Sequence, residues 1–199
     1  MNNLLCFTAD NGINGRELWV QSVCSSIQIA TANFSTQQSN KYYYFDNASC
    51  SKLIAKVAPF INKATLANVS VWKETTQPSN FVKRHYEIVP ATGSSISNAT
   101  ISLYFTQQEF NDFNAVNTIK LPGNSTDVAN IANLYIVHHP GTSKNRTGLP
   151  DSYSSEVKWI KPDAKKVLWD AANYRWELSF TTSDFSSSDM AKPFTCCNT

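Results

Sequence analysis

Short strand-like segments with a two-residue period follow one another along most of this chain, and they constrain the fold more than any other feature. Apolar and polar residues alternate most plainly at 52–57 and 82–89. Such alternation is typical of strands that bury one face. Turn-forming residues separate these segments. We expect strands at 26–31, 41–45, 52–57, 68–72, 82–89, 100–105, 132–138, 154–160, 165–169 and 174–180.

One helix interrupts this series of strands. Thr106-Gln-Gln-Glu109 has the capping-box pattern, and Phe110 and Phe113 follow it three residues apart. The sequence therefore predicts one short helix near 106–115. Many short strands with a single capped helix predict an all-β fold, specifically an antiparallel β-sandwich of immunoglobulin-like or jelly-roll-like type.

The first residues form a separate unit in this interpretation. The segment 7–20 has a short apolar strand, a turn rich in Asp, Asn and Gly, and a second strand at 17–20. Gly12 and Gly15 supply the positive φ angles that tight turns need, so we expect a β-hairpin. The predicted organisation is a hairpin at 1–22, a sandwich at 23–185 and a poorly ordered tail at 186–199, where the apolar pattern fades.

A second hairpin is predicted near the end of the sandwich. Trp169 and Trp176 should lie on its two strands, with the turn at 170–173. Counting alternate positions from Trp176 places Leu178 and Phe180 on the same face, so we expect all three to be buried. Leu168 is also expected in the core.

Composition excludes several classes of partner. The 199 residues carry a net charge of +2, and only 16% of them are charged, with no basic or acidic run. We therefore expect no nucleic-acid partner and no membrane insertion. The first residues lack the basic start and long apolar stretch of a signal peptide, so an export signal is expected upstream of this chain.

Five cysteines give a weak indication of compartment. Cys6, Cys24, Cys50, Cys196 and Cys197 form no Cys-x-x-Cys pair and no zinc-ligand spacing. Cys24 and Cys50 flank predicted strands, and we predict a disulfide between them. Closing this loop of about 25 residues is worth on the order of 3 kcal/mol. Cysteine usage therefore favours an extracellular or cell-surface protein.

Two resemblances extend this interpretation. The segment 7–20, FTADNGINGRELWV, closely resembles the ELWxxDGT-type repeat of large secreted and surface bacterial proteins, although Gln21-Ser-Val replaces the final Asp-Gly-Thr. A lone repeat implies that further domains lie upstream. The segments 83–92, 101–114 and 167–180 resemble the β-sandwich module near the C-terminus of large secreted proteins of Gram-negative bacteria with type IX secretion. That resemblance implies a module without enzymatic activity, but here no sorting domain follows it.

Histidines offer the main candidates for chemistry. His85 lies in an alternating strand with no obvious carboxylate partner, and His138 and His139 are adjacent, so their side chains should point to opposite faces of a strand. The motifs of serine hydrolases, zinc proteases, phosphate loops and dinucleotide sites are absent. We therefore predict no catalytic residue, no metal and no cofactor.

Aromatic residues are the side chains best suited to contact a ligand. Candidate ligand-binding positions are Tyr42, Tyr44, Trp72 and Trp159, whose rings could stack on sugars. The predicted function is a non-enzymatic structural or adhesive module of a secreted surface protein, with glycans or other surface proteins as partners. The alternative is a carbohydrate-binding module of a secreted polysaccharide-active enzyme, and a more distant one is a hydrolase.

Overall fold

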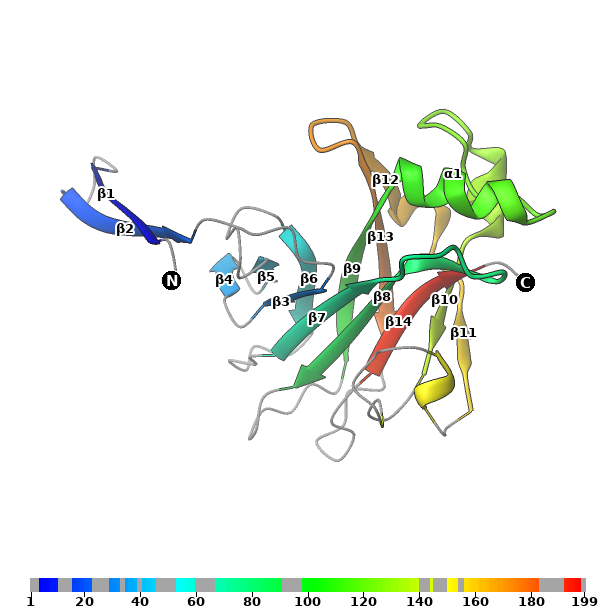
Figure 1. The fold of residues 1–199 in the computed structure, drawn as a ribbon, viewed down its shortest axis with the longest axis horizontal. Coiled ribbons are helices and arrows are strands. Elements are labelled where there is room, and N and C mark those ends of the chain that lie inside the picture. The colour runs from blue at the N-terminus through cyan, green and yellow to red at the C-terminus, as the bar shows by residue number, and fades with distance from the viewer. Residues whose placement is uncertain are drawn as a thin grey trace.

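The computed structural model describes residues 4–10, 16–22, 29–32, 35–38, 41–45, 53–59, 67–90, 98–139, 144, 150–153, 156–182 and 192–197. Strands β1 (Leu4–Asp10) and β2 (Arg16–Ser22) pair only with each other, in antiparallel register from Leu4 opposite Ser22 to Asp10 opposite Arg16. This pairing agrees with the two strands expected in the N-terminal hairpin, whose connecting residues 11–15 lie outside the described residues. Figure 1 shows it apart from the other strands.

The first of two six-stranded sheets has the order β11-β10-β14-β8-β7-β3. Its strands are β3 (Ile29–Ala32), β7 (Ala67–Lys73), β8 (Phe81–Pro90), β10 (Tyr135–His138), β11 (Lys158–Ile160) and β14 (Lys192–Cys197). All its pairings are antiparallel. Chain segments far apart in sequence thus meet in one sheet.

The second six-stranded sheet has the order β12-β13-β9-β6-β5-β4 and is also antiparallel. Its strands are β4 (Ser35–Gln38), β5 (Lys41–Phe45), β6 (Leu53–Pro59), β9 (Ala99–Thr106), β12 (Val167–Asp170) and β13 (Arg175–Thr182). The all-β fold class is shown by these two sheets.

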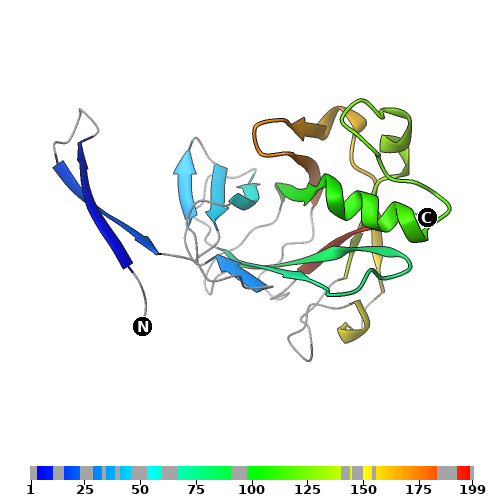
Figure 2. The same cartoon turned by 45° about the horizontal axis from the view of Figure 1, so that its top comes forward.

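One α-helix lies among the described residues, at the predicted place. Helix α1 (Gln107–Val116) begins after Thr106, whose side chain accepts a hydrogen bond from the Glu109 amide, while the Glu109 carboxylate accepts one from the Thr106 amide. The predicted capping box is confirmed. The helix contacts β8 of the first sheet and β9 of the second (Figure 2). Short 3₁₀ helices η1 (Ala129–Asn133), η2 (Pro150–Ser152) and η3 (Ala164–Lys166) complete the described elements.

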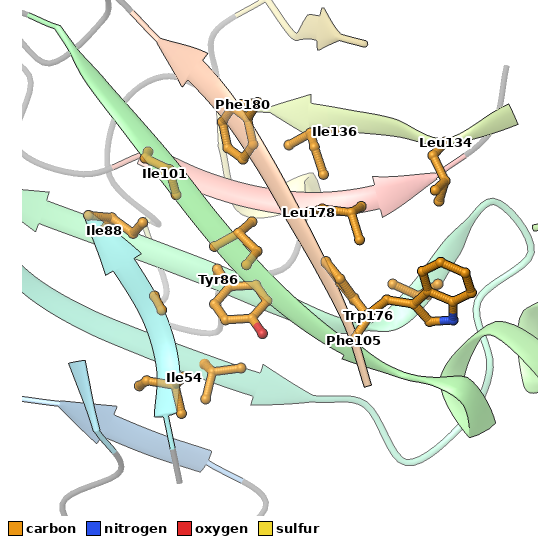
Figure 3. Close-up of a cluster of buried hydrophobic side chains, with 14 of the residues drawn as sticks. Ile54, Tyr86, Ile88, Ile101, Phe105, Leu134, Ile136, Trp176, Leu178 and Phe180 are labelled. Atoms are coloured by element: carbon orange, nitrogen blue, oxygen red, sulfur yellow. The ribbon is translucent and has the colours of Figure 1, made fainter. Parts of the chain in front are cut away.

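A single buried apolar cluster includes side chains of both sheets and of α1 (Figure 3). Trp176, Leu178 and Phe180 of β13 are all buried in it, as their alternate positions predict. Phe110 of α1 lies between the rings of Phe105 and Trp176, with centroids 6.0 and 6.1 Å away. The helix is thereby anchored in the core by aromatic packing.

The β12–β13 hairpin confirms one prediction and corrects another. Trp169 lies opposite Trp176, and the turn falls at 171–174. Leu168, however, is 55% exposed, so its placement in the core was wrong. It is the register partner of half-buried Glu177, whereas Val167, the partner of Leu178, is buried in its place.

Several boundaries differ from the prediction. The strand expected at 132–138 starts only at Tyr135, because η1 occupies the residues before it. Of the residues described within 154–160, Lys158–Ile160 forms the strand. Within the tail expected to be poorly ordered, Lys192–Cys197 forms β14 between β10 and β8. Cys24 and Cys50, the predicted disulfide pair, lie outside the described residues.

Candidate functional site

The two tryptophans proposed as ligand contacts lie on one face of the first sheet. Strand register forms a row across five strands: Trp159 on β11, Val137 on β10, Thr195 on β14, His85 on β8 and Trp72 on β7. Directly opposite residues in antiparallel strands share a face. With strands about 4.8 Å apart, Trp159 and Trp72 are separated by roughly 19 Å. We call this surface the outer face, since the core residues Tyr86 and Ile136 occupy the alternate positions.

Trp159 is the more accessible of the two and has an aromatic neighbour. It is 47% exposed, whereas Trp72 is half-buried. Its ring meets that of Tyr135 edge-on, with centroids 6.2 Å apart and an interplanar angle of 75°. The Lys161 ammonium lies 5.0 Å from the centre of the Tyr135 ring and 3.4 Å from its hydroxyl. Trp159, Tyr135 and Lys161 thus lie together at the edge strand β11, and we call these three side chains the aromatic corner.

Tyr42 and Tyr44 lie on the other sheet, so the structure does not bring the four candidate residues together. Both belong to β5, where their register partners are Val57 and Ala55. These partners are fully buried members of the core cluster. The side chains of Tyr42 and Tyr44 lie outside the described part of the chain.

His85 has a carboxylate partner that the sequence analysis did not identify. Its Nε2 is hydrogen-bonded to Oε1 of Glu74, which directly follows β7. The β7–β8 register creates this contact: Trp72 lies opposite His85, and the Glu74 amide donates to the Lys83 carbonyl at 2.8 Å. A sequence prediction that paired the strands 68–72 and 82–89 as neighbours would have placed Glu74 close to His85. His85 is buried, and burial lowers its pKa, although the Glu74 carboxylate opposes that shift.

His139 lies close to His85 on the same face. It follows β10 and is two positions beyond Val137. Its ring centroid lies 5.6 Å from that of Tyr153, whose hydroxyl donates to Glu87 Oε1 at 3.2 Å. Burial lowers the pKa of His139, and the nearby His85 lowers it further. The structure therefore gathers two histidines, two carboxylates and a tyrosine from four segments of the chain.

His138 and His139 do not form a chelating pair. His138 is the register partner of Phe194 and is completely buried on the core side, whereas His139 continues the outer-face series of Tyr135 and Val137. Across the described ranges, no three His, Cys, Asp or Glu side chains are placed to hold a metal ion.

Other charged groups form ion pairs that join elements of the fold. Glu109 is fully buried and receives Arg84 Nη2 at 2.9 Å and Nε at 3.0 Å, so α1 is fixed to β8 by a two-pronged ion pair. Lys83 and Asp112 add a partly exposed pair at 2.8 Å. On the second sheet, Glu177 binds Lys56 at 2.8 Å and accepts from the Tyr104 hydroxyl at 3.1 Å.

Comparison with protein-family models, curated proteins and solved structures finds no match to this chain. Within the residues that the structure describes, no helix has the length and apolar character needed to cross a membrane.

Proposed function

We propose that this chain is a non-enzymatic structural or adhesive β-sandwich module of a secreted, multidomain surface protein. The observation that carries the proposal is the single core cluster, which takes its side chains from both six-stranded sheets. A sandwich buries one face of each of two antiparallel sheets against a common core, and this cluster supports such an arrangement. Such a scaffold holds its ends apart and presents its outer faces to partners.

The use of charge supports a scaffold more than a catalyst. The ion pairs Arg84–Glu109, Lys83–Asp112 and Lys56–Glu177 each join two different elements. His85 does have a carboxylate partner, which is one component of acid–base chemistry, but the ring is buried where no substrate could reach it. We find no nucleophile paired with it among the described residues.

The extracellular assignment rests on the sequence resemblances. The N-terminal hairpin resembles an ELWxxDGT-type repeat, and the body resembles the modules of type IX-secreted proteins, which are surface or secreted chains. Upstream domains of a longer chain are the first partners that this proposal implies. A disulfide between Cys24 and Cys50 belongs to the same proposal, and non-reducing peptide mapping of the exported protein tests it.

A screen of the purified chain for ester, glycoside and peptide hydrolysis tests the absence of enzymatic activity. We expect no turnover above that of a heat-unfolded sample. Turnover that disappears in His85→Gln, His138→Gln or His139→Gln would replace the scaffold proposal with an enzymatic one.

The aromatic corner favours a second candidate function, binding of a glycan. Trp159 offers an exposed indole face, Tyr135 closes one side of it, and the Lys161 ammonium can donate to sugar hydroxyl or carboxylate oxygens. Glycan-array screening followed by calorimetry tests this function, since a pure spacer should bind nothing.

The matched variants are Trp159→Ala and Leu168→Ala. Both truncate an exposed apolar side chain, but Leu168 lies on the second sheet, away from the aromatic corner. For any glycan that binds, Trp159→Ala should weaken the affinity at least tenfold, about 1.4 kcal/mol. Leu168→Ala should leave it unchanged. Equal affinities for the two variants would contradict a site at the aromatic corner.

A further inference from the structure

A cluster of five titratable side chains fastens a chain segment to the outer face of the first sheet. We call it the histidine cluster: Glu74, His85, Glu87, His139 and Tyr153. The Tyr153 hydroxyl donates to Glu87 Oε1 at 3.2 Å, and its ring lies against the His139 ring. Tyr153 directly follows η2, so these contacts hold the segment 150–153 against β8 and the end of β10.

Each of the two buried histidines has a ring nitrogen without a hydrogen-bond partner among the described residues, which favours the neutral form of the ring. His85 is 1% exposed and His139 is 6% exposed. Among the described residues, Nδ1 of His85 and Nε2 of His139 have no hydrogen-bond partner. A neutral imidazole can leave one nitrogen unpaired, because that nitrogen carries no proton. Protonation turns both nitrogens of each ring into charged donors. The nitrogen that has no acceptor is then a buried, unpaired donor on a cation, which is unfavourable.

Of the two rings, only that of His85 has a hydrogen bond to a carboxylate among the described residues, namely Glu74. Glu74 opposes the downward shift that burial gives the His85 pKa, whereas burial and the neighbouring His85 both lower the pKa of His139. The Glu87 carboxylate, from β8, already accepts from Tyr153. The β14 register partners of Glu87 and His85 are Pro193 and Thr195, which are uncharged residue types. The Lys83 ammonium on β8 is held by Asp112 at 2.8 Å.

We propose that the histidine cluster is an acid-sensitive latch, which holds the segment 150–153 on the outer face when both rings are neutral and releases it when they are protonated. Release lets water reach the two cations, and it separates the Tyr153 ring from His139. The latch goes beyond the proposed function and holds whether or not the module binds a glycan.

Amide hydrogen exchange at Lys144 measures the latch directly. The Lys144 amide donates to the Ser152 carbonyl at 3.0 Å, so its protection reports whether the segment is in place. We expect exchange in the parent chain, corrected for the intrinsic effect of pH, to rise on the order of tenfold between about pH 7.5 and about pH 5. Amides in the core of β9 should keep their protection over this range. Unchanged protection at Lys144 would overturn the proposal.

The control variant is His139→Phe, which keeps a ring beside Tyr153 but cannot be protonated. Its Lys144 amide should stay protected at the lower pH, and the same loss as in the parent would count against the latch. Glu74→Gln gives an independent measurement. Glu74 is half-buried, so its substitution should leave the fold intact even if replacement of the buried His139 ring does not. Removing that carboxylate takes away the charge that stabilises protonated His85 in the latched state, so the midpoint of release should move to higher pH. No shift or a downward shift would contradict the role of His85.

Discussion

At the scale of single residues, β13 shows how strictly alternation decides burial in this protein. Trp176 is 1% exposed, stacks on Phe110, contacts Trp169 edge-on, and donates from Nε1 to Gln107 Oε1 at 2.9 Å. Three positions before the turn, Leu168 lies outside the core although it is the more apolar residue type. Register, not hydrophobicity, therefore separates the two.

Trp176→Ala should lower the free energy of unfolding by about 3–5 kcal/mol, as expected for truncating a large core side chain. Leu168→Ala on the adjacent strand should change it by less than about 0.5 kcal/mol, because the leucine is largely exposed. Urea denaturation of the two variants and the parent measures both values. Similar losses for the two would show that the faces are assigned wrongly.

Tyr174 is the one non-glycine residue with a positive φ, 51°, in the described part of the chain. It lies in the turn between β12 and β13 and is 77% exposed, so its ring contributes little burial in return for the left-handed backbone. Glycine adopts this conformation without steric conflict. Tyr174→Gly should raise the free energy of unfolding by about 0.5–1 kcal/mol in the same denaturation assay. A loss of stability would mean that the tyrosine side chain makes a contact that outweighs the strain.

At the scale of elements, helix α1 depends on one carboxylate that has two roles. Glu109 closes the capping box at Thr106 and is also the buried partner of Arg84. The sequence analysis predicted the first role from the local Thr-x-x-Glu pattern. It missed the second because Arg84 lies 25 residues away, and only the pairing of α1 with β8 brings the two together.

Glu109→Gln should destabilise the protein by about 3–5 kcal/mol, since it removes the buried carboxylate charge that pairs with the partly buried Arg84 guanidinium. The matched control is Asp112→Asn, one turn further along the same helix, which removes the partly exposed pair with Lys83. We expect it to cost no more than about 1 kcal/mol. Thermal unfolding followed by circular dichroism compares the two variants, and equal costs would argue against a buried ion pair at Glu109.

At the scale of the whole molecule, local sequence patterns predicted secondary-structure elements, whereas the histidine cluster depends on strand pairing between distant segments. Alternation and turn chemistry predicted the N-terminal hairpin, α1 and the β12–β13 hairpin, which all form between neighbours in sequence. β14 was missed because its short segment, KPFTCC, follows a Ser-rich stretch and becomes a strand only between β10 and β8. The histidine cluster was missed for the same reason: Glu74, His85, His139 and Tyr153 come from separate segments that two sheet registers bring together.

The pH dependence of global stability is a property of the whole fold and supplies the last prediction. Burial lowers the pKa of both His85 and His139 below the ordinary value of 6.5, so the unfolded chain binds protons that the native chain does not. Stability is therefore fully present above about pH 6.5 and falls as the pH decreases toward the lowered values. Asp112 does not contribute in this window, because hydrogen bonds from Lys83 and Gln108 lower its pKa and its contribution is lost only in stronger acid. Thermal unfolding of the parent chain should show a melting temperature that decreases between about pH 7 and about pH 5, and this decrease should be smaller in the double variant His85→Gln, His139→Phe. A melting temperature that is flat in the parent, or decreases equally in both, would show that the histidines are not buried in their neutral form.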